Sequence, residues 1–191
     1  MKITSAVFKR GIVEDNEILK DGMSQIAFIG RSNAGKSSLL NSLTAKKNLA
    51  ITSNTPGRTK EINIFLINGT HYFLDLPGYG YAKASGATLE KLSQLIYWYL
   101  FESNYSQKVV LIIDAFVGPT DDDLGMLRAL EEAGKEIVVV ANKVDKIKKS
   151  QYRNQLDKLK AQLVGHKLFP YSTKTKFGMP ELLDELLDEV L

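Results

Sequence analysis

Short apolar runs alternate with longer amphipathic runs along most of this chain. The runs 109–113 and 137–140 are apolar at every position, which is typical of strands buried on both faces of a sheet. Because strand, helix and strand follow one another repeatedly, the pattern predicts a mainly parallel sheet with helices on both faces. We expect strands at 24–30, 62–67, 71–75, 109–114, 136–142 and 167–172, and helices at 36–47, 88–103, 120–133, 150–164 and 180–191.

Two stretches depart from the parallel pattern. Asn68 and Gly69 form a two-residue hairpin signal, so the strands on either side are expected to be antiparallel, with 62–67 at the edge of the sheet. Residues 1–23 fit the scheme poorly and are interpreted as an extra strand or an arm. With 191 residues, 44% of them hydrophobic, the chain 1–191 is expected to form a single domain.

The composition excludes several kinds of protein. Cysteine is absent, which rules out disulfides, thiolate catalysis and cysteine-bound zinc, and two histidines cannot form a metal site alone. The chain has no apolar run long enough for a membrane span and no signal peptide, so we expect a soluble cytoplasmic protein. The net charge of +3 permits an anionic partner but is common among soluble proteins.

A glycine-rich turn connects the predicted strand 24–30 to the first predicted helix. The stretch "GRSNAGKSSLLN", residues 30–41, matches the phosphate-binding pattern G-x-x-x-x-G-K-S. Gly30 and Gly35 allow the backbone to curl, so that N–H groups converge at the positive end of the helix. Lys36 can reach the terminal phosphates of a nucleotide, and the hydroxyl group of Ser37 can bind the Mg²⁺ that accompanies a nucleoside triphosphate.

Two further motifs follow predicted strands. In "DLPG", Asp75 can hold Mg²⁺ through a water molecule, and Gly78 can offer its N–H to a terminal phosphate. In "NKVD", the carboxylate of Asp145 can accept hydrogen bonds from N1–H and the 2-amino group of guanine, which adenine does not present. Asn142 can bond N7 of the base, and the methylene stem of Lys143 can cover its face. The three motifs together predict a guanine-nucleotide site at the carboxyl edge of the sheet.

These strings resemble those of Ras-like, translation-factor-related GTPases, and specifically those of the EngB (YihA/YsxC) family of bacterial GTPases in the TrmE-Era-EngA-EngB group. The resemblance covers nearly the whole chain, and "GRSNAGKSSLLN" with "TPGRT" and "PGYGYA" is its most specific part. It implies the three-layer α/β fold of P-loop NTPases, a Ras-like G domain whose sheet is mostly parallel with one antiparallel edge strand. It also implies binding of GTP and GDP with Mg²⁺ and no DNA partner. A single-domain chain of this size gives no sign of an obligate dimer, so a monomer is expected. The implied role is assembly of the large ribosomal subunit or its precursor, with an association with cell division and septation.

The resemblance assigns further residues to the nucleotide. Thr59 is expected to bind Mg²⁺ in the GTP state and so to order the loop 52–59, although residue chemistry alone does not favour it over Thr55. Residues 171–173 are expected to form the last guanine-binding loop, with a backbone N–H reaching the base oxygen; Thr173 departs from the usual Ser-Ala-Lys. Expected metal ligands are Ser37, Thr59 and, through water, Asp75. The full nucleotide-binding set is Gly30, Arg31, Ser32, Asn33, Ala34, Gly35, Lys36, Ser37, Gly57, Arg58, Thr59, Lys60, Glu61, Asp75, Leu76, Pro77, Gly78, Asn142, Lys143, Val144, Asp145, Tyr171, Ser172 and Thr173.

The catalytic groups depart from the Ras-like pattern. Where those enzymes have a glutamine that orients the attacking water, this chain has Tyr79, which predicts slow hydrolysis without a partner. Asn33 is interpreted either as a residue that holds K⁺ against the phosphates or as one that pins the loop backbone. Arg31 and Arg58 are alternative sources of positive charge. The expected catalytic residues are Lys36, Asn33 and Thr59.

Three functions remain open at this point. The first is a Mg²⁺-dependent GTPase switch in ribosome assembly. The second is a GTP-sensing module with negligible intrinsic hydrolysis, which Tyr79 favours. The third is an RNA-modification-linked or membrane-associated GTPase, and the lack of an appended RNA-binding domain or membrane-insertion segment counts against it.

Other conspicuous stretches have simpler interpretations. "TDDD", residues 120–123, is expected to be a helix cap, and 97–101 is expected to place one face in the core. Lys146, Lys148 and Lys149 are interpreted as a solvated face, with RNA phosphates as the alternative partner.

Overall fold

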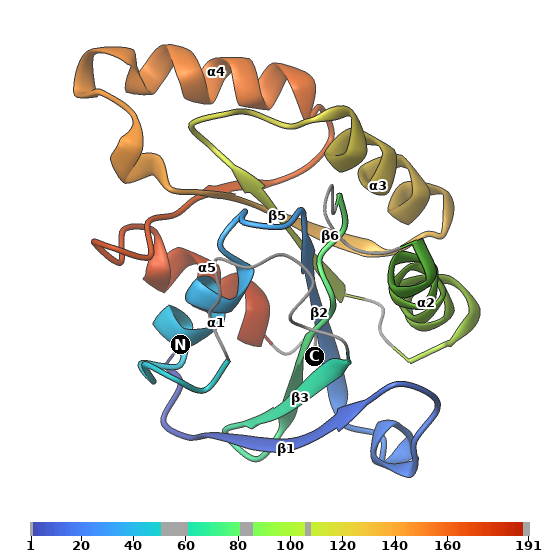
Figure 1. Cartoon of the computed structure of the whole chain (residues 1–191). Helices are drawn as coiled ribbons and strands as arrows, with labels where there is room; N and C mark the ends of the chain where they lie inside the picture. The colour runs from blue at the N-terminus through green and yellow to red at the C-terminus, as the bar shows by residue number, and fades with distance from the viewer. Residues whose placement is uncertain (1, 51–60, 81–85, 106–107, 189–191) are drawn as a thin grey trace.

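A seven-stranded sheet forms the centre of the part of the chain that the computed structural model describes, residues 2–50, 61–80, 86–105 and 108–188 (Figure 1). Its strand order is β1-β3-β4-β2-β5-β6-β7. The strands from β4 to β7 in this order are parallel, whereas β3 is antiparallel to both of its neighbours, β1 and β4. The strands are β1 Ala6–Ile12, β2 Ser24–Gly30, β3 Ile62–Ile67, β4 His71–Asp75, β5 Lys108–Asp114, β6 Glu136–Asn142 and β7 Leu168–Pro170.

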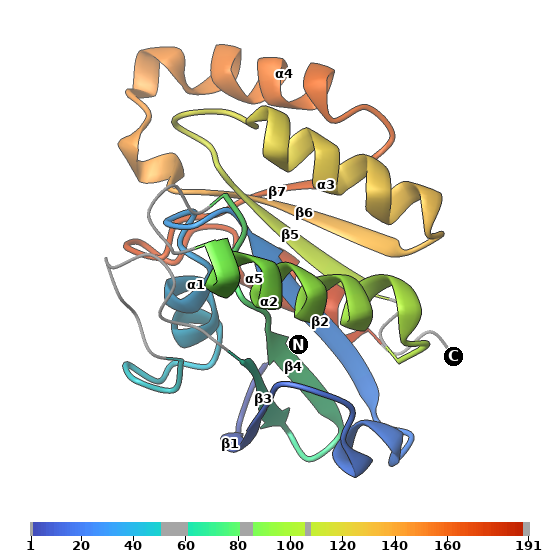
Figure 2. The same ribbon diagram turned by 45° about the vertical axis from the view of Figure 1, so that its right-hand side comes forward.

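Helices cover both faces of the sheet, which confirms the three-layer fold predicted from the sequence (Figure 2). Leucines of α1 and α5 pack with β2 and β5 on one face, and apolar residues of α2, α3 and α4 pack on the other. The helices are α1 Lys36–Leu43, α2 Gly86–Tyr97, α3 Asp121–Glu132, α4 Tyr152–Gln162 and α5 Met179–Leu187, and the shorter helical turns are η1 Glu17–Lys20, η2 Trp98–Glu102, η3 Val144–Lys146 and η4 Lys149–Gln151.

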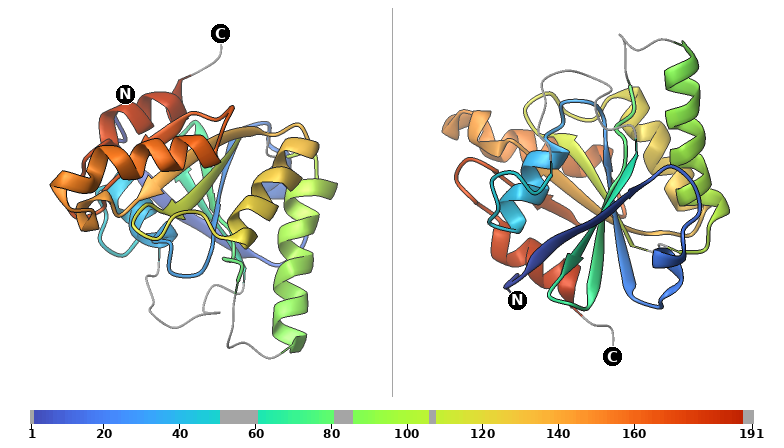
Figure 3. Two further views of the ribbon diagram at one scale, coloured as in Figure 1. Left: turned by 90° about the horizontal axis from the view of Figure 1, so that it is seen from above. Right: turned by 60° about the horizontal axis from the view of Figure 1, so that its bottom comes forward.

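The predicted hairpin is confirmed, but the predicted sheet edge is wrong. Asn68 and Gly69 have φ angles of 52° and 75° and connect β3 to β4. However, β1 pairs with the other side of β3, so that β3 is internal and β1 forms the edge (Figure 3). The pairing register shifts between Phe8 and Arg10. This bulge interrupts the alternation of buried and exposed side chains, which explains why the sequence pattern of β1 is weak.

The cap predicted at 120–123 is confirmed. Thr120 accepts a hydrogen bond from the N–H of Asp123, and Asp123 in turn accepts one from the N–H of Thr120. The core face predicted for 97–101 is also confirmed, because Tyr99 and Leu100 are fully buried in η2. None of the described helices is both long enough and apolar enough to cross a membrane.

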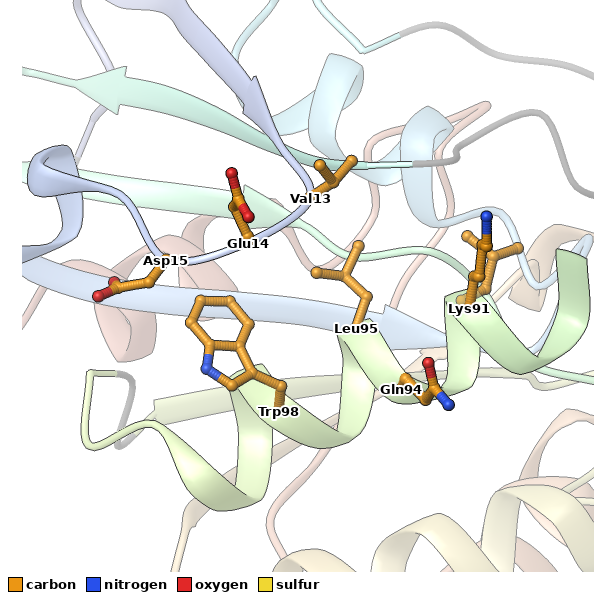
Figure 4. Close-up of a pocket in the computed structure, with 8 residues that line it drawn as sticks. Val13, Glu14, Asp15, Lys91, Gln94, Leu95 and Trp98 are labelled. Carbon is orange, nitrogen blue, oxygen red and sulfur yellow. The ribbon is translucent and has the colours of Figure 1, made fainter.

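A surface cavity of about 550 Å³ lies between the segment that follows β1 and the helical pair α2 and η2 (Figure 4). Its lining is largely apolar and includes Val13, Leu95 and Trp98. None of its lining residues belongs to the nucleotide motifs predicted from the sequence, so this cavity is separate from them.

Candidate functional site

The predicted phosphate-binding loop leads from the end of β2 into α1. Gly35 has a φ angle of 98°, a conformation that favours glycine, and a Cβ atom there would lie 2.3 Å from Nδ2 of Asn142. At Gly30, a Cβ atom would lie 2.6 Å from the carbonyl oxygen of Ile112. Both glycines therefore allow close packing that any side chain would prevent.

Lys36, Ser37 and Asp75 meet at the start of α1. The ammonium group of Lys36 forms an ion pair with the carboxylate of Asp75, and these residues are 8% and 2% exposed. The hydroxyl group of Ser37 donates to the same carboxylate at 3.4 Å. The structure thus brings together the phosphate-binding lysine and two of the metal ligands that the sequence predicts.

The "NKVD" segment is braced against the phosphate-binding loop. Asn142 is fully buried, and its Nδ2 donates to the carbonyl oxygen of Ala34 at 3.0 Å. The ammonium group of Lys143 donates to the carbonyl oxygen of Asn33 at 2.6 Å and forms an ion pair with Asp114 at 2.7 Å. These bonds hold the segment that is predicted to read the base in a fixed relation to the phosphate-binding loop. The Asn142 amide has a second N–H, so the predicted contact with the base edge stays a prediction.

Asp145 lies beside the loop that follows β7. The hydroxyl group of Ser172 donates to Oδ1 of Asp145 at 2.6 Å. The N–H groups of Tyr171 and Ser172 donate to Ala141 and Phe177 within the protein. The N–H of Thr173 has no acceptor among the described residues, so of the three it is the one that suits the predicted contact with the base oxygen.

Tyr79 is held by the phosphate-binding loop and by α3. Its carbonyl oxygen accepts from the N–H of Ser32 at 2.9 Å, and its hydroxyl group donates to Asp123 at 2.7 Å. Burial, followed by the negative charge of Asp123, raises the pKa of Tyr79 well above its ordinary value of 10.0. Tyr79 is therefore a neutral hydrogen-bond donor to α3 and does not take the place of the water-orienting glutamine.

One polar atom of the loop is buried without a partner. The hydroxyl oxygen of Ser32 makes no hydrogen bond to any described residue. Because a buried hydroxyl group without a partner is costly, such a group fits a site that a ligand completes.

The donors present fit Mg²⁺. The hydroxyl group of Ser37 and the carboxylate of Asp75 are oxygen ligands, which Mg²⁺ prefers, and no cluster of three or more His, Cys, Asp or Glu residues suited to another metal occurs among the described residues. A hydroxyl ligand from Ser37 and a contact through water from Asp75 agree with the tendency of Mg²⁺ to keep waters and substrate phosphates in its coordination shell.

The remaining predicted residues either lie outside the described part of the chain or make no described side-chain contact with this site. Gly57, Arg58, Thr59 and Lys60 lie outside the described residues, as does the alternative ligand Thr55. The carboxylate of Glu61 lies against Gly11 of β1, beyond β3 and β4 from the phosphate-binding loop. Asn33 has a φ angle of 68°, and its exposed side chain makes no hydrogen bond to another described residue.

Sequence reasoning missed two residues that support the site. The first is Asp114, which ends the buried strand β5 and forms an ion pair with Lys143. Like Asp75, it directly follows an apolar run, and this position could have identified it as a site residue. The second is Ser42, whose hydroxyl group is 2.8 Å from that of the buried Tyr171. No sequence spacing indicates this contact, because 129 positions separate the two residues.

The fold and the three linked motifs define the chain as a P-loop GTPase. A family described as "50S ribosome-binding GTPase" matches residues 25–143, and one described as "Elongation factor Tu GTP binding domain" matches residues 103–191. The probable GTP-binding protein EngB of Clostridium perfringens (strain 13 / Type A) is 42% identical over 202 residues, covering 100% of this chain and 98% of that protein. The EngB protein of Acholeplasma laidlawii (strain PG-8A) is 38% identical and covers 97% of each. This chain belongs to the EngB family of GTP-binding proteins.

Solved structures agree with the fold. A crystal structure of a probable GTP-binding protein EngB matches with a TM-score of 0.71 at 23% identity, covering 86% of this chain and 97% of that one. A variant of Aquifex aeolicus Era bound to GDP·AlF4⁻ matches with a TM-score of 0.73 at 25% identity, covering 87% of this chain and 56% of that one.

Proposed function

We propose that this chain is a Mg²⁺-dependent GTPase that acts in the cytoplasm, as a monomer, as a nucleotide-controlled switch in assembly of the large ribosomal subunit. The observation that carries this proposal is the linkage of the motifs at one edge of the sheet. Lys36 is paired with Asp75, and Asn142 and Lys143 are bonded to carbonyl groups of the phosphate-binding loop. Phosphate, metal and base contacts would then be made by groups that already hold one another in position.

The ribosomal partner is supported by the relatives. The matching family is described as ribosome-binding, and a related Era structure contains MgGDPNP and a segment of 16S ribosomal RNA. The large subunit or its precursor is the partner we propose, and the role in cell division and septation follows from the family resemblance.

The proposed roles of the residues follow their positions. Residues 30–37 bind the phosphates, with Lys36 at the terminal ones. Ser37, Thr59 and, through water, Asp75 hold Mg²⁺, which would neutralise the charge that develops on the phosphates. Asp145 reads guanine, and the N–H of Thr173 bonds the base oxygen.

Titration of the protein with labelled GTP, GDP and ATP in Mg²⁺ tests this proposal. Guanine-selective binding is expected, and equal affinity for ATP would remove the base-recognition argument. Lys36→Ala should weaken triphosphate binding, and unchanged affinity would refute its phosphate role. Removing one partner of a buried ion pair costs about 3–5 kcal/mol, so the melting temperature of this variant must be measured alongside. Co-sedimentation with large ribosomal subunits in GTP and in GDP then tests the partner.

Hydrolysis is proposed to be slow in the isolated protein, with K⁺ held at Asn33 as the accelerating cation. The exposed side chain of Asn33, which no described residue bonds, is available for this role. Single-turnover hydrolysis should be faster in K⁺ than in Na⁺, and equal rates would exclude the K⁺ site.

The second candidate function is a GTP sensor with negligible hydrolysis. The observation that favours it is the bond of Tyr79 to Asp123, which commits this side chain to α3. Hydrolysis that stays undetectable even with large ribosomal subunits would support the sensor.

A further inference from the structure

Positive charge is concentrated in less than a fifth of the sequence. Residues 143–176 contain ten Lys or Arg residues and two Asp residues, a net charge of +8. Because the whole chain carries +3, the remaining residues carry −5. A surface with this excess, on a protein that is otherwise slightly acidic, favours a polyanionic partner.

Most of these cations form no ion pair with another described residue. Lys143 pairs with Asp114 and Lys167 pairs with Glu185. Within the described parts of the chain, the other eight make no ion pair. Their ammonium and guanidinium groups can therefore bind phosphates without first breaking an ion pair.

Two aromatic rings lie among these cations. The rings of Tyr152, at the start of α4, and Phe177, in the loop before α5, are in edge-to-face contact with centroids 6.4 Å apart. Phe177 is 54% exposed despite this contact. Both segments lie on the left of Figure 1. Folding leaves more than half of Phe177 exposed to water, and a partner with a flat apolar face would cover the exposed part.

The cations next to the rings define a basic aromatic surface. We use this name for Lys148, Lys149, Tyr152, Arg153, Lys176 and Phe177, whose four cations are all exposed. Each cation is within four positions of one of the rings in the sequence, so the positive charges necessarily lie close to the rings.

This surface adjoins the base-reading loop. The carbonyl oxygen of Phe177 accepts from the N–H of Ser172, and the hydroxyl group of Ser172 bonds Asp145. The backbone of Phe177 is thus linked through Ser172 to the carboxylate proposed to read guanine.

We propose that the basic aromatic surface binds single-stranded or looped RNA, with a base stacked on Phe177 and phosphates bound by the surrounding cations. The inference rests on the proposed function in one respect, because the RNA bound in the cell would be ribosomal RNA. Exposed aromatic rings among cations suit unpaired bases, which offer a flat face together with a phosphate chain. An acidic protein or an anionic membrane would bind the positive charges, but its binding would not depend on stacking against Phe177.

The β1 strand offers the natural matched control. Phe8 is 49% exposed, contacts the ring of Phe65, and is followed by Lys9 and Arg10. It lies at the opposite edge of the sheet from β6 and β7. Residues 1–23 contain four Lys or Arg residues and four Asp or Glu residues, so this similar-looking surface lacks the charge excess.

The test measures binding of a short labelled single-stranded RNA by fluorescence anisotropy at several salt concentrations. Phe177→Ala should weaken binding about tenfold. The double substitution Lys148→Gln and Lys149→Gln should reduce the slope of log affinity against log salt by about 1.4. The matched variants, Phe8→Ala and the double substitution Lys9→Gln and Arg10→Gln, should bind as the unsubstituted protein does.

Three outcomes would overturn the inference. The first is absence of RNA binding by the unsubstituted protein, and the second is equal affinity of the Phe177→Ala variant with normal GTP binding and melting temperature. The third is binding to vesicles of phosphatidylglycerol but not to RNA.

Co-sedimentation with large ribosomal subunits separates this inference from the proposed function. If the RNA binds at the basic aromatic surface but the subunit does not bind, the proposed partner is wrong and the inference stands. If the subunit binds equally to the Phe177→Ala and lysine variants, and these variants also bind the RNA normally, the proposed function stands and the inference fails.

Discussion

Gly35 shows at the scale of one residue how the two halves of the nucleotide site are fitted together. Its left-handed backbone could be predicted, because the motif G-x-x-x-x-G-K-S requires a tight curl. Its contact with Asn142 could not be predicted, because more than one hundred positions separate the two residues and only the strand order brings them together. Most of the described site residues followed from their motifs, whereas Asp114 and Ser42, which support them, did not.

Substitution of Ser32 should affect stability and binding in opposite directions. Ser32→Ala removes a buried hydroxyl group that has no partner among the described residues. We expect the free energy of unfolding of the nucleotide-free protein to rise by about 1 kcal/mol, and the affinity for GTP to fall about fivefold or more. Denaturant unfolding and GTP titration measure the two effects.

The exposed Ser150 provides the control, since Ser150→Ala should change neither quantity. Unchanged GTP affinity of the Ser32→Ala variant would show that this hydroxyl group does not contact the nucleotide.

Asp145→Asn should change the base preference. The amide replaces one acceptor of the carboxylate with a donor, so it suits xanthine better than guanine. Loss of two hydrogen bonds to a charged group should reduce GTP affinity about 100-fold or more. Competition between GTP and XTP measures the change, with Asp157→Asn in α4 as the control for loss of one negative charge. If guanine preference is retained, "NKVD" is not the base-reading segment.

At the scale of elements, the segment after β4 is attached on two sides. Its backbone bonds the phosphate-binding loop, and the side chain of Tyr79 bonds α3. The sequence shows that Tyr79 is unusual for a GTPase. It could not indicate that Asp123 is the hydrogen-bond partner of Tyr79, because Asp123 was already explained as part of a helix cap. In the structure the same carboxylate serves both purposes.

Tyr79→Phe tests this attachment. Removing the hydroxyl group should lower the free energy of unfolding by about 1–2 kcal/mol, because the lost bond is to a carboxylate. Tyr97→Phe is the matched control, since Tyr97 is 57% exposed, and this change should be near neutral. Equal stability of the two variants would mean that the contact with α3 contributes nothing.

At the scale of the whole molecule, the fold class was predictable because strand, helix and motif order agreed with one another. The position of β1 was not predictable, since a bulge interrupts its alternation and its partner β3 is distant in the sequence. The helix α1 also ends at Leu43, earlier than predicted. The following segment is instead held by Asn41, whose side chain bonds both the N–H and the carbonyl oxygen of Ala50 at 2.7 Å.

Several tyrosines should make the protein sensitive to alkaline pH. Burial is the largest cause that raises the pKa values of Tyr72, Tyr79, Tyr152 and Tyr171, and that of Tyr72 reaches about 12. The folded protein keeps phenolic protons that the unfolded chain loses above its pKa of 10.0. This contribution to stability is complete below pH 10.0 and is lost as the pH rises toward and beyond 12.

Tyr72→Phe isolates one of these groups. Near pH 8 the variant should be less stable by about 1 kcal/mol, because Tyr72 donates a hydrogen bond to Asp21 at 2.7 Å. Above pH 10 the difference should shrink, since phenylalanine cannot ionise in the unfolded chain. Denaturant unfolding at several pH values measures this difference, and a constant difference would contradict the raised pKa.

The position of β1 at the edge of the sheet matters while the protein is being synthesised. The strand β1 leaves the ribosome before its partner β3 does, because Ala6 pairs with Ile67, which is synthesised 61 residues later. During that interval the strand has no partner and exposes Val7 and Phe8, a hazard for pairing between nascent chains. The adjacent Lys9 and Arg10 and the bulge between Phe8 and Arg10 are features that discourage such pairing. The same charges that remain at the finished edge would therefore protect the chain before its sheet exists.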